Sequence, residues 1–140
     1  MGASQGGGGD ALRRNTVLVI DDDEKVRRAI ARMLKVDGFD VLEARDGSEA
    51  VHLYGNHAGE VVAATLDLVM PTTDGRETLA MLSAFGPNLP IVVSTALPKP
   101  DNLLGRVPGT RGVGYLQKPY SAAQLAAEVR RVIAEAGKRA

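Results

Sequence analysis

Short apolar runs rich in β-branched residues recur five times along the chain, and stretches with helical spacing separate them. Several of the runs lack alternation of polar and apolar residues, which is typical of strands covered on both faces of a parallel sheet. Strands that alternate with helices predict an α/β fold, a three-layer α/β/α sandwich around a five-stranded parallel sheet with right-handed crossovers. The predicted strands span residues 17–20, 40–43, 61–66, 90–94 and 113–116.

The first helical stretch follows the first predicted strand. Val26, Ile30, Met33 and Leu34 have the spacing of an apolar helical stripe, and Gly38 is the expected end of the helix. The basic residues that fall between these apolar positions are predicted to lie on the outer, solvent-facing side: Arg27, Arg28, Arg32 and Lys35.

Three further helices are predicted along the rest of the chain. The second follows Asp46, the third starts near Asp74 and ends at Gly86, and Ser121 is the expected N-cap of the last. Residues 98–112 contain three Pro and three Gly, so this stretch is predicted to be mostly loop. Any fourth helix there is expected to be short or irregular, around residues 101–106.

Length and composition restrict the class of protein. A chain of 140 residues is about one domain, with residues 15–138 as the expected folded unit. Residues 1–14 are predicted to form a flexible tail, because five of the first nine residues are Gly and no apolar periodicity appears. The chain has no Cys, which excludes disulfides and Cys-based metal sites.

Charge and hydropathy exclude several partners. The 17 basic and 17 acidic residues cancel, which argues against a dedicated nucleic-acid binder. No apolar run approaches the roughly 18 residues that span a bilayer, and the Gly-rich start lacks the apolar core of a secretory signal. We therefore expect a cytoplasmic protein that binds neither nucleic acid nor membrane.

Chemically active side chains follow the predicted strands. The first strand runs into Asp21 and Asp22, and the third runs into Asp67. The fourth ends at Thr95, and Lys118 follows the fifth. Ligands of open α/β sheets bind at the carboxyl ends of the strands, so these groups are expected to converge if the strand order brings the strands together.

Such a cluster has the parts for phosphoryl transfer. Three carboxylates repel one another unless a cation holds them, and Mg²⁺ prefers oxygen ligands of this kind. A carboxylate can act as the nucleophile, while a Lys ammonium and a hydroxyl hold the phosphoryl oxygens.

Each feature also has a purely structural interpretation. An acidic run is favoured at a helix N-terminus, Asp67 could be a turn residue, Thr95 a structural hydroxyl and Lys118 a surface charge. Their joint occurrence at strand ends favours the functional interpretation. Other polar residues are expected to be surface groups: His52, His57, Arg130, Arg131, Lys138 and Arg139.

Four segments together resemble the receiver domain of two-component response regulators. Residues 17–23 (VLVIDDD) resemble the family's first strand and acidic pair, and residues 66–75 resemble its phosphoacceptor loop. Residues 90–96 match the strand that ends in Thr or Ser, and residues 115–120 (YLQKPY) match the Lys-Pro-aromatic signature. The resemblance covers residues 16–136 and implies the flavodoxin-like strand order 2-1-3-4-5.

The resemblance implies a role for each acidic residue. Asp67 would accept a phosphoryl group from a phosphohistidine on a histidine kinase or a histidine phosphotransfer protein, with Mg²⁺ as cofactor. Asp22 would bind Mg²⁺ directly, Asp21 mainly through water, and Asp67 and the backbone carbonyl of Val69 would complete the protein ligands.

It implies roles for the other strand ends as well. Thr95 and the Ala96 N–H would hold the phosphoryl group, and Lys118 would pair with it through a cis Lys118-Pro119 peptide. Tyr115 falls on the aromatic switch position that turns inward when Thr95 moves, which would signal to a downstream protein.

Several alternatives remain open at this point. The chain could be a single-domain regulator or the excised receiver of a hybrid kinase. It could also be a degenerate receiver that acts only as an interaction module. A haloacid-dehalogenase-type phosphatase would use Asp21 as its nucleophile, although Lys25 stands where that motif has Thr or Val. A flavodoxin-type cofactor binder is disfavoured, because no phosphate-cradling loop follows the first strand.

Overall fold

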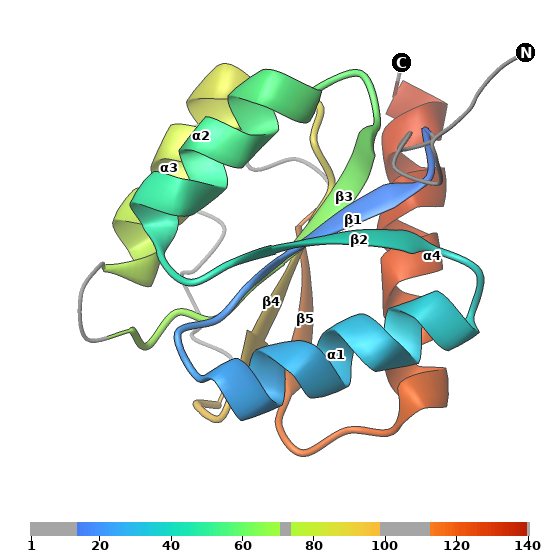
Figure 1. The fold of residues 1–140 in the computed structure, drawn as a ribbon. Helices are drawn as coiled ribbons and strands as arrows, with labels where there is room; N and C mark the ends of the chain where they lie inside the picture. Colours follow the sequence, from blue (N-terminus) through green and yellow to red (C-terminus); the bar gives the residue numbers. More distant parts are fainter. Residues whose placement is uncertain (1–13, 71–73, 99–112, 140) are drawn as a thin grey trace, which may run out of the picture.

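A five-stranded parallel sheet lies between two layers of helices in the computed structural model, which describes residues 14–70, 74–98 and 113–139 (Figure 1). The strand order is β2-β1-β3-β4-β5, which confirms the predicted architecture and order. The predicted tail and the predicted irregular fourth helix fall almost wholly outside the described residues. The elements are β1 (Thr16–Ile20), α1 (Glu24–Val36), β2 (Asp40–Ala44), α2 (Gly47–His57), β3 (Val61–Leu66), α3 (Gly75–Phe85), β4 (Ile91–Thr95), β5 (Val113–Gln117) and α4 (Ala122–Arg139).

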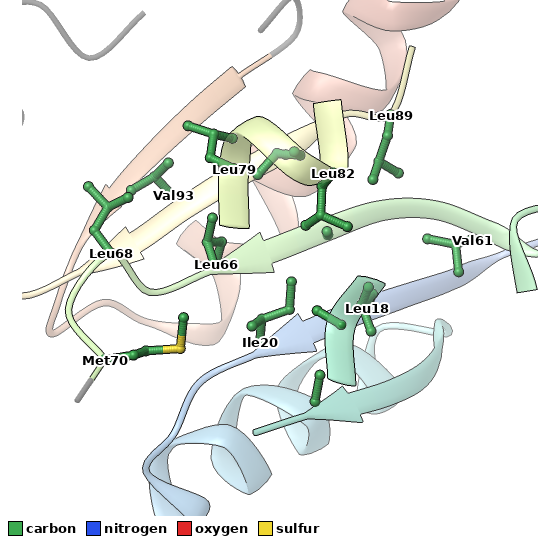
Figure 2. Packing of buried hydrophobic residues seen from close by; sticks show 14 residues of the cluster. Leu18, Ile20, Val61, Leu66, Leu68, Met70, Leu79, Leu82, Leu89 and Val93 are labelled. Carbon is green, nitrogen blue, oxygen red and sulfur yellow. The ribbon is translucent and has the colours of Figure 1, made fainter. Parts of the chain in front are cut away.

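Both faces of the sheet are covered. Helices α2 and α3 cover one face, and helices α1 and α4 cover the other (Figure 1). On the first face, Leu79 and Leu82 of α3 pack with Ile20 and Leu66 of the sheet (Figure 2). Every residue of β1 is buried, which explains why this strand shows no alternation of polar and apolar residues.

The register of the central strands sets where the site lies. Ile20 of β1 pairs with Ala44 of β2 on one side and with Leu66 of β3 on the other. The residues that follow these strands therefore leave the sheet at the same level. Thr95 of β4 pairs with Gln117 of β5, so the next residue, Lys118, emerges at this edge too.

Local caps begin and end the helices as the sequence predicts. Asp46 and Asp74 accept hydrogen bonds from backbone N–H groups in the first turns of α2 and α3. Ser121 and Gln124 cap α4 reciprocally, since each side chain accepts from the other's backbone N–H. Gly38 follows α1 with φ of +99°, a left-handed conformation that favours Gly.

The prediction that Arg27 lies on the outer face of α1 is wrong. Only 6% of Arg27 is exposed, and its guanidinium lies between α1 and the ends of β1 and β2. Arg27 precedes Ile30 by three positions and Ala31 by four, so it shares their buried face of the helix. A buried charge is tolerated there because Glu43 pairs with it at 3.0 Å.

Candidate functional site

Three carboxylates converge at the carboxyl edge of the sheet. Asp21 and Asp22 follow β1, Asp67 follows β3, and one oxygen from each lies within 4.8 Å of the others. The backbone also joins the two strand ends, because the Asp67 N–H donates to the Ile20 carbonyl at 3.1 Å. Asp21 is 1% exposed and Asp67 is 9% exposed, whereas Asp22 lies at the surface. The cluster is therefore open to solvent on the side of Asp22.

Each buried carboxylate has one oxygen fixed by its own turn. The Asp23 N–H donates to Oδ1 of Asp21, and the Val69 N–H donates to Oδ1 of Asp67, both at 3.0 Å. These are side-chain-to-backbone bonds two residues along the chain, which hold an Asp in one orientation. Consequently the Oδ2 atoms of Asp21 and Asp67 both face a common partner, Lys118.

Lys118 bridges the two buried carboxylates. Its Nζ lies 2.8 Å from Oδ2 of Asp21 and 3.3 Å from Oδ2 of Asp67. The Lys118-Pro119 peptide is cis, as the resemblance implies, and the Lys118 N–H donates to the Thr95 carbonyl at 2.8 Å. Lys118 is thus held at both its backbone and its ammonium.

Burial and charge act in opposite directions on these groups. Burial raises the pKa of the Asp21 carboxyl, and the hydrogen bonds from Lys118 and from the Asp23 N–H offset only part of that rise. Burial alone would lower the pKa of Lys118, but its bonds to Asp21 and the charges of Asp21 and Asp67 outweigh it and raise that pKa. Lys118 therefore remains protonated at neutral pH.

Thr95 and Tyr115 both contact the backbone of Leu97. Thr95 is fully buried, and its hydroxyl accepts a hydrogen bond from the Leu97 N–H at 3.4 Å. The half-buried Tyr115 donates its hydroxyl to the Leu97 carbonyl. The neighbouring Ala96 is exposed, and its carbonyl accepts from the Gln117 side chain at 3.4 Å. A displacement of the Leu97 backbone would therefore change the hydrogen bonds of both Thr95 and Tyr115.

The residues present suit Mg²⁺. All the candidate ligands are oxygen atoms, and two oxygens bound to one Mg²⁺ lie at most about 4.2 Å apart. Oxygens that already lie within 4.8 Å of one another need only a small adjustment to reach that spacing. Asp21, Asp22 and Asp67 fit as the residues that would hold the ion.

Some residues near the site were not singled out from the sequence. The buried hydroxyl of Ser94, next to Thr95, is hydrogen-bonded to the Tyr120 hydroxyl at 2.6 Å. A second such residue is Arg27, whose Nη1 donates to the Asp21 carbonyl at 3.1 Å. The only sequence signal for the burial of Arg27 was its spacing of three and four positions from Ile30 and Ala31. Both His lie on α2, with His52 exposed at the surface as predicted and His57 half-buried and paired with Glu60.

Comparison with known proteins agrees with this geometry. A family model described as the response regulator receiver domain matches residues 17–130. The chain belongs to this family. As a receiver domain it is 38% identical over 110 residues to the response regulator MprA of Mycobacterium sp. strain KMS. That match covers 77% of this chain and 46% of MprA, so the chain spans about half the length of such curated relatives.

Solved receiver structures share the fold. A receiver domain protein from Clostridium thermocellum superposes with a TM-score of 0.78 and 25% identity, covering 89% of this chain and 98% of the other. A chain of the CheX-CheY-BeF3-Mg+2 complex from Borrelia burgdorferi gives a TM-score of 0.74 and 29% identity, with coverage of 84% of this chain and 87% of the other. Among the helices of the described ranges, none is long and apolar enough to cross a membrane.

Proposed function

We propose that this receiver domain accepts a phosphoryl group on Asp67 from a phosphohistidine of a histidine kinase or histidine phosphotransfer protein, with Mg²⁺ as cofactor. The single observation that carries the proposal is the convergence of three carboxylates at the carboxyl edge of the sheet, where Lys118 bridges two of them, Asp21 and Asp67. Asp21, Asp22, Asp67 and the Val69 carbonyl would hold Mg²⁺. When bound, the ion screens the negative charge of the incoming phosphoryl group.

The reacting atom of Asp67 follows from its hydrogen bonds. Oδ1 is held by the Val69 N–H, whereas among the described residues Oδ2 has the longer contact to Lys118 at 3.3 Å. Oδ2 attacks phosphorus in line, a new P–O bond forms, and the P–N bond to the donor's imidazole breaks. The imidazole leaves with the bonding pair and takes up a proton. Lys118 then donates to a phosphoryl oxygen, and Thr95 and the Ala96 N–H hold the others.

Asp21 is the weaker candidate for the nucleophile. It is 1% exposed, against 9% for Asp67, and Lys118 lies closer to its Oδ2, at 2.8 Å, than to Oδ2 of Asp67, at 3.3 Å. An attacking carboxylate needs a free lone pair directed at phosphorus. This arrangement supports Asp67 over the phosphatase alternative.

A groove beside Lys118 supports docking of a phosphodonor at α1. Its volume is about 250 Å³, and its lining is almost wholly apolar: Val26, Ala29, Ile30, Met33, Lys118, Pro119 and Tyr120. A donor helix that fills it would bring a phosphohistidine close to Asp67.

Phosphorylation would act on output by shifting a conformational equilibrium. We propose that a phosphoryl group bound by Thr95 draws Thr95 and Tyr115 inward together. In the unphosphorylated structure both hydroxyls are hydrogen-bonded to the backbone of Leu97, so the two side chains are linked. Moving such an equilibrium from 1:99 to 99:1 needs about 5.5 kcal/mol. Charge-assisted hydrogen bonds and an ion pair to Lys118 at a partly buried site are of the strong kind that this requires.

Acetyl phosphate tests the proposed function without the cognate kinase. We expect the mass of the intact protein to rise by one phosphoryl group in the presence of Mg²⁺, and the labelling to fall to background with excess chelator. Sodium chloride at matched ionic strength, added in place of Mg²⁺, serves as the control. Labelling that is absent with Mg²⁺, or equal with and without it, would identify an interaction module or another chemistry instead.

The phosphoryl group should be long-lived. Val69 and Leu97, two residues after Asp67 and Thr95, are 56% and 46% exposed and flank the expected path of the attacking water. Neither side chain can orient that water by a hydrogen bond. Polar substitutions Val69→Asn and Leu97→Gln together should accelerate dephosphorylation by about tenfold or more. The decay is followed by intact mass after removal of acetyl phosphate, with the exposed Val36→Asn as control. Rapid decay that both substitutions leave unchanged would contradict this prediction.

A further inference from the structure

Arg27 connects the buried side of α1 to the acidic end of β1. Its Nε donates to Oε1 of Glu43 on β2 at 3.0 Å, and its Nη1 donates to the backbone carbonyl of Asp21 at 3.1 Å. Glu43 pairs with Val19 in the sheet register, so both partners of the guanidinium belong to the ends of adjacent strands. Within the described residues, Arg27 contacts the acidic cluster through the Asp21 carbonyl and not through a carboxylate. The chemistry described above therefore gives Arg27 no role in phosphoryl transfer.

The Asp21 carbonyl lies beyond the last paired residue of the strand. The β1–β2 ladder ends at Ile20 and Ala44, after which the Asp21 N–H still donates to the Ala44 carbonyl at 3.1 Å. The carbonyl of Asp21 has Arg27 as its donor where a longer strand would supply a backbone N–H. Arg27 therefore extends the ordered end of β1 by one peptide unit.

That peptide unit is the one that leads into Asp22. The carbonyl of Asp21 and the N–H of Asp22 belong to the same planar group, so fixing one fixes the direction of the other. Asp22 itself is exposed and lies at the open side of the acidic cluster. The buried Asp21 side chain is held independently by the Asp23 N–H and Lys118. Asp22 thus depends on the orientation of its preceding peptide more than Asp21 does.

We propose that Arg27, held in place by Glu43, is a positioning residue for the divalent cation: it fixes the peptide between Asp21 and Asp22 and so directs the Asp22 carboxylate into the acidic cluster. This inference rests on the proposed function, because it assigns Asp22 to the cation. Outer residues that orient a ligand typically contribute 10–100-fold to metal affinity.

A comparison of two substitutions on the same helix separates positioning from charge. Arg27→Met and Arg28→Met each remove one positive charge from α1, but the Arg28 side chain is exposed, and within the described residues it forms an ion pair with Glu24 at 3.6 Å. Loss of a positive charge alone favours a cation, so it would tighten Mg²⁺ binding. If Arg27 positions Asp22, Arg27→Met instead raises the Mg²⁺ Kd about tenfold, while Arg28→Met changes it by less than about twofold.

The Kd is measured by calorimetric titration of the folded protein with Mg²⁺ alone, below the unfolding transition of each variant. The backbone amide resonance of Asp22 in the cation-free protein gives a second readout, which should shift in Arg27→Met and stay in place in Arg28→Met. Glu43→Gln, which keeps an acceptor oxygen for Arg27, should raise the Kd less than Arg27→Met does.

If Arg27→Met does not fold, Arg27→Lys replaces it in the Mg²⁺ titration, with Arg28→Lys as the control variant. A single ammonium cannot reproduce both bonds of the guanidinium, so the Mg²⁺ Kd should still rise severalfold. An unchanged or tighter Kd in a folded Arg27 variant overturns the inference while leaving the proposed function intact. Failure of the unsubstituted protein to bind Mg²⁺ overturns the proposed function, and this inference with it.

Discussion

Replacing Asp67 with Asn should abolish covalent labelling by acetyl phosphate in the presence of Mg²⁺. The amide keeps the shape of the side chain, and its oxygen can still accept from the Val69 N–H, so the turn after β3 is preserved. What disappears is the anionic Oδ2 that faces Lys118 and that attacks phosphorus. Intact mass spectrometry should show the labelled fraction at background after incubation times that label the unsubstituted protein fully.

The same labelling experiment on Asp21→Asn tests which of the two Asp residues is the nucleophile. Asp21 lies in the same cluster and bonds to the same Lys118, so this variant changes the local charge by the same amount. It should weaken Mg²⁺ binding and slow the labelling while Asp67 still becomes phosphorylated. If labelling survives Asp67→Asn and is lost in Asp21→Asn, Asp21 is the nucleophile and the phosphatase interpretation holds instead.

Replacing Gly75 with Ala should cost about 3 kcal/mol of folding free energy. A Cβ atom at this position would overlap the Leu68 Cα and lie 2.5 Å from the Leu68 carbonyl oxygen. Both are backbone atoms, so no side-chain rotation relieves the contact, and either Leu68 or the start of α3 has to move. Leu68 follows Asp67 directly, so labelling by acetyl phosphate should slow as well. Urea unfolding measures the loss of stability.

Gly55→Ala is the matched control for Gly75→Ala. Gly55 lies inside α2, and a Cβ there meets nothing within 4 Å. Ala is the better helix former, so this variant should be as stable as the unsubstituted protein or more stable by up to about 1 kcal/mol. Equal unfolding free energies for Gly55→Ala and Gly75→Ala would contradict the close packing of Leu68 on the start of α3.

Much of the fold could be predicted because its signals are local. The apolar, β-branched composition of residues 17–20 identifies a strand buried on both faces, and that strand is buried throughout. A cap such as Asp74 needs only the N–H of Arg76, two residues away. The groups at the strand ends could be predicted for a similar reason: once the strands are parallel, their carboxyl ends share an edge, and Asp21, Asp67 and Lys118 meet there.

The side chains that the sequence misplaced or overlooked depend on contacts distant along the chain. Arg is a residue type that usually lies at the protein surface. Arg27 can be buried because its guanidinium pairs with the carboxylate of Glu43, 16 positions away in the sequence. Tyr120 and Ser94 are 26 positions apart, and nothing in either local pattern indicates that their hydroxyls meet. The amino-acid sequence by itself therefore determined the strands, the helix ends and which acidic groups gather at one edge. Only the tertiary structure decided which hydrogen bonds and ion pairs hold the side chains around that edge. The reason is that a buried polar group is stabilised by partners that come within hydrogen-bonding distance only in the folded chain.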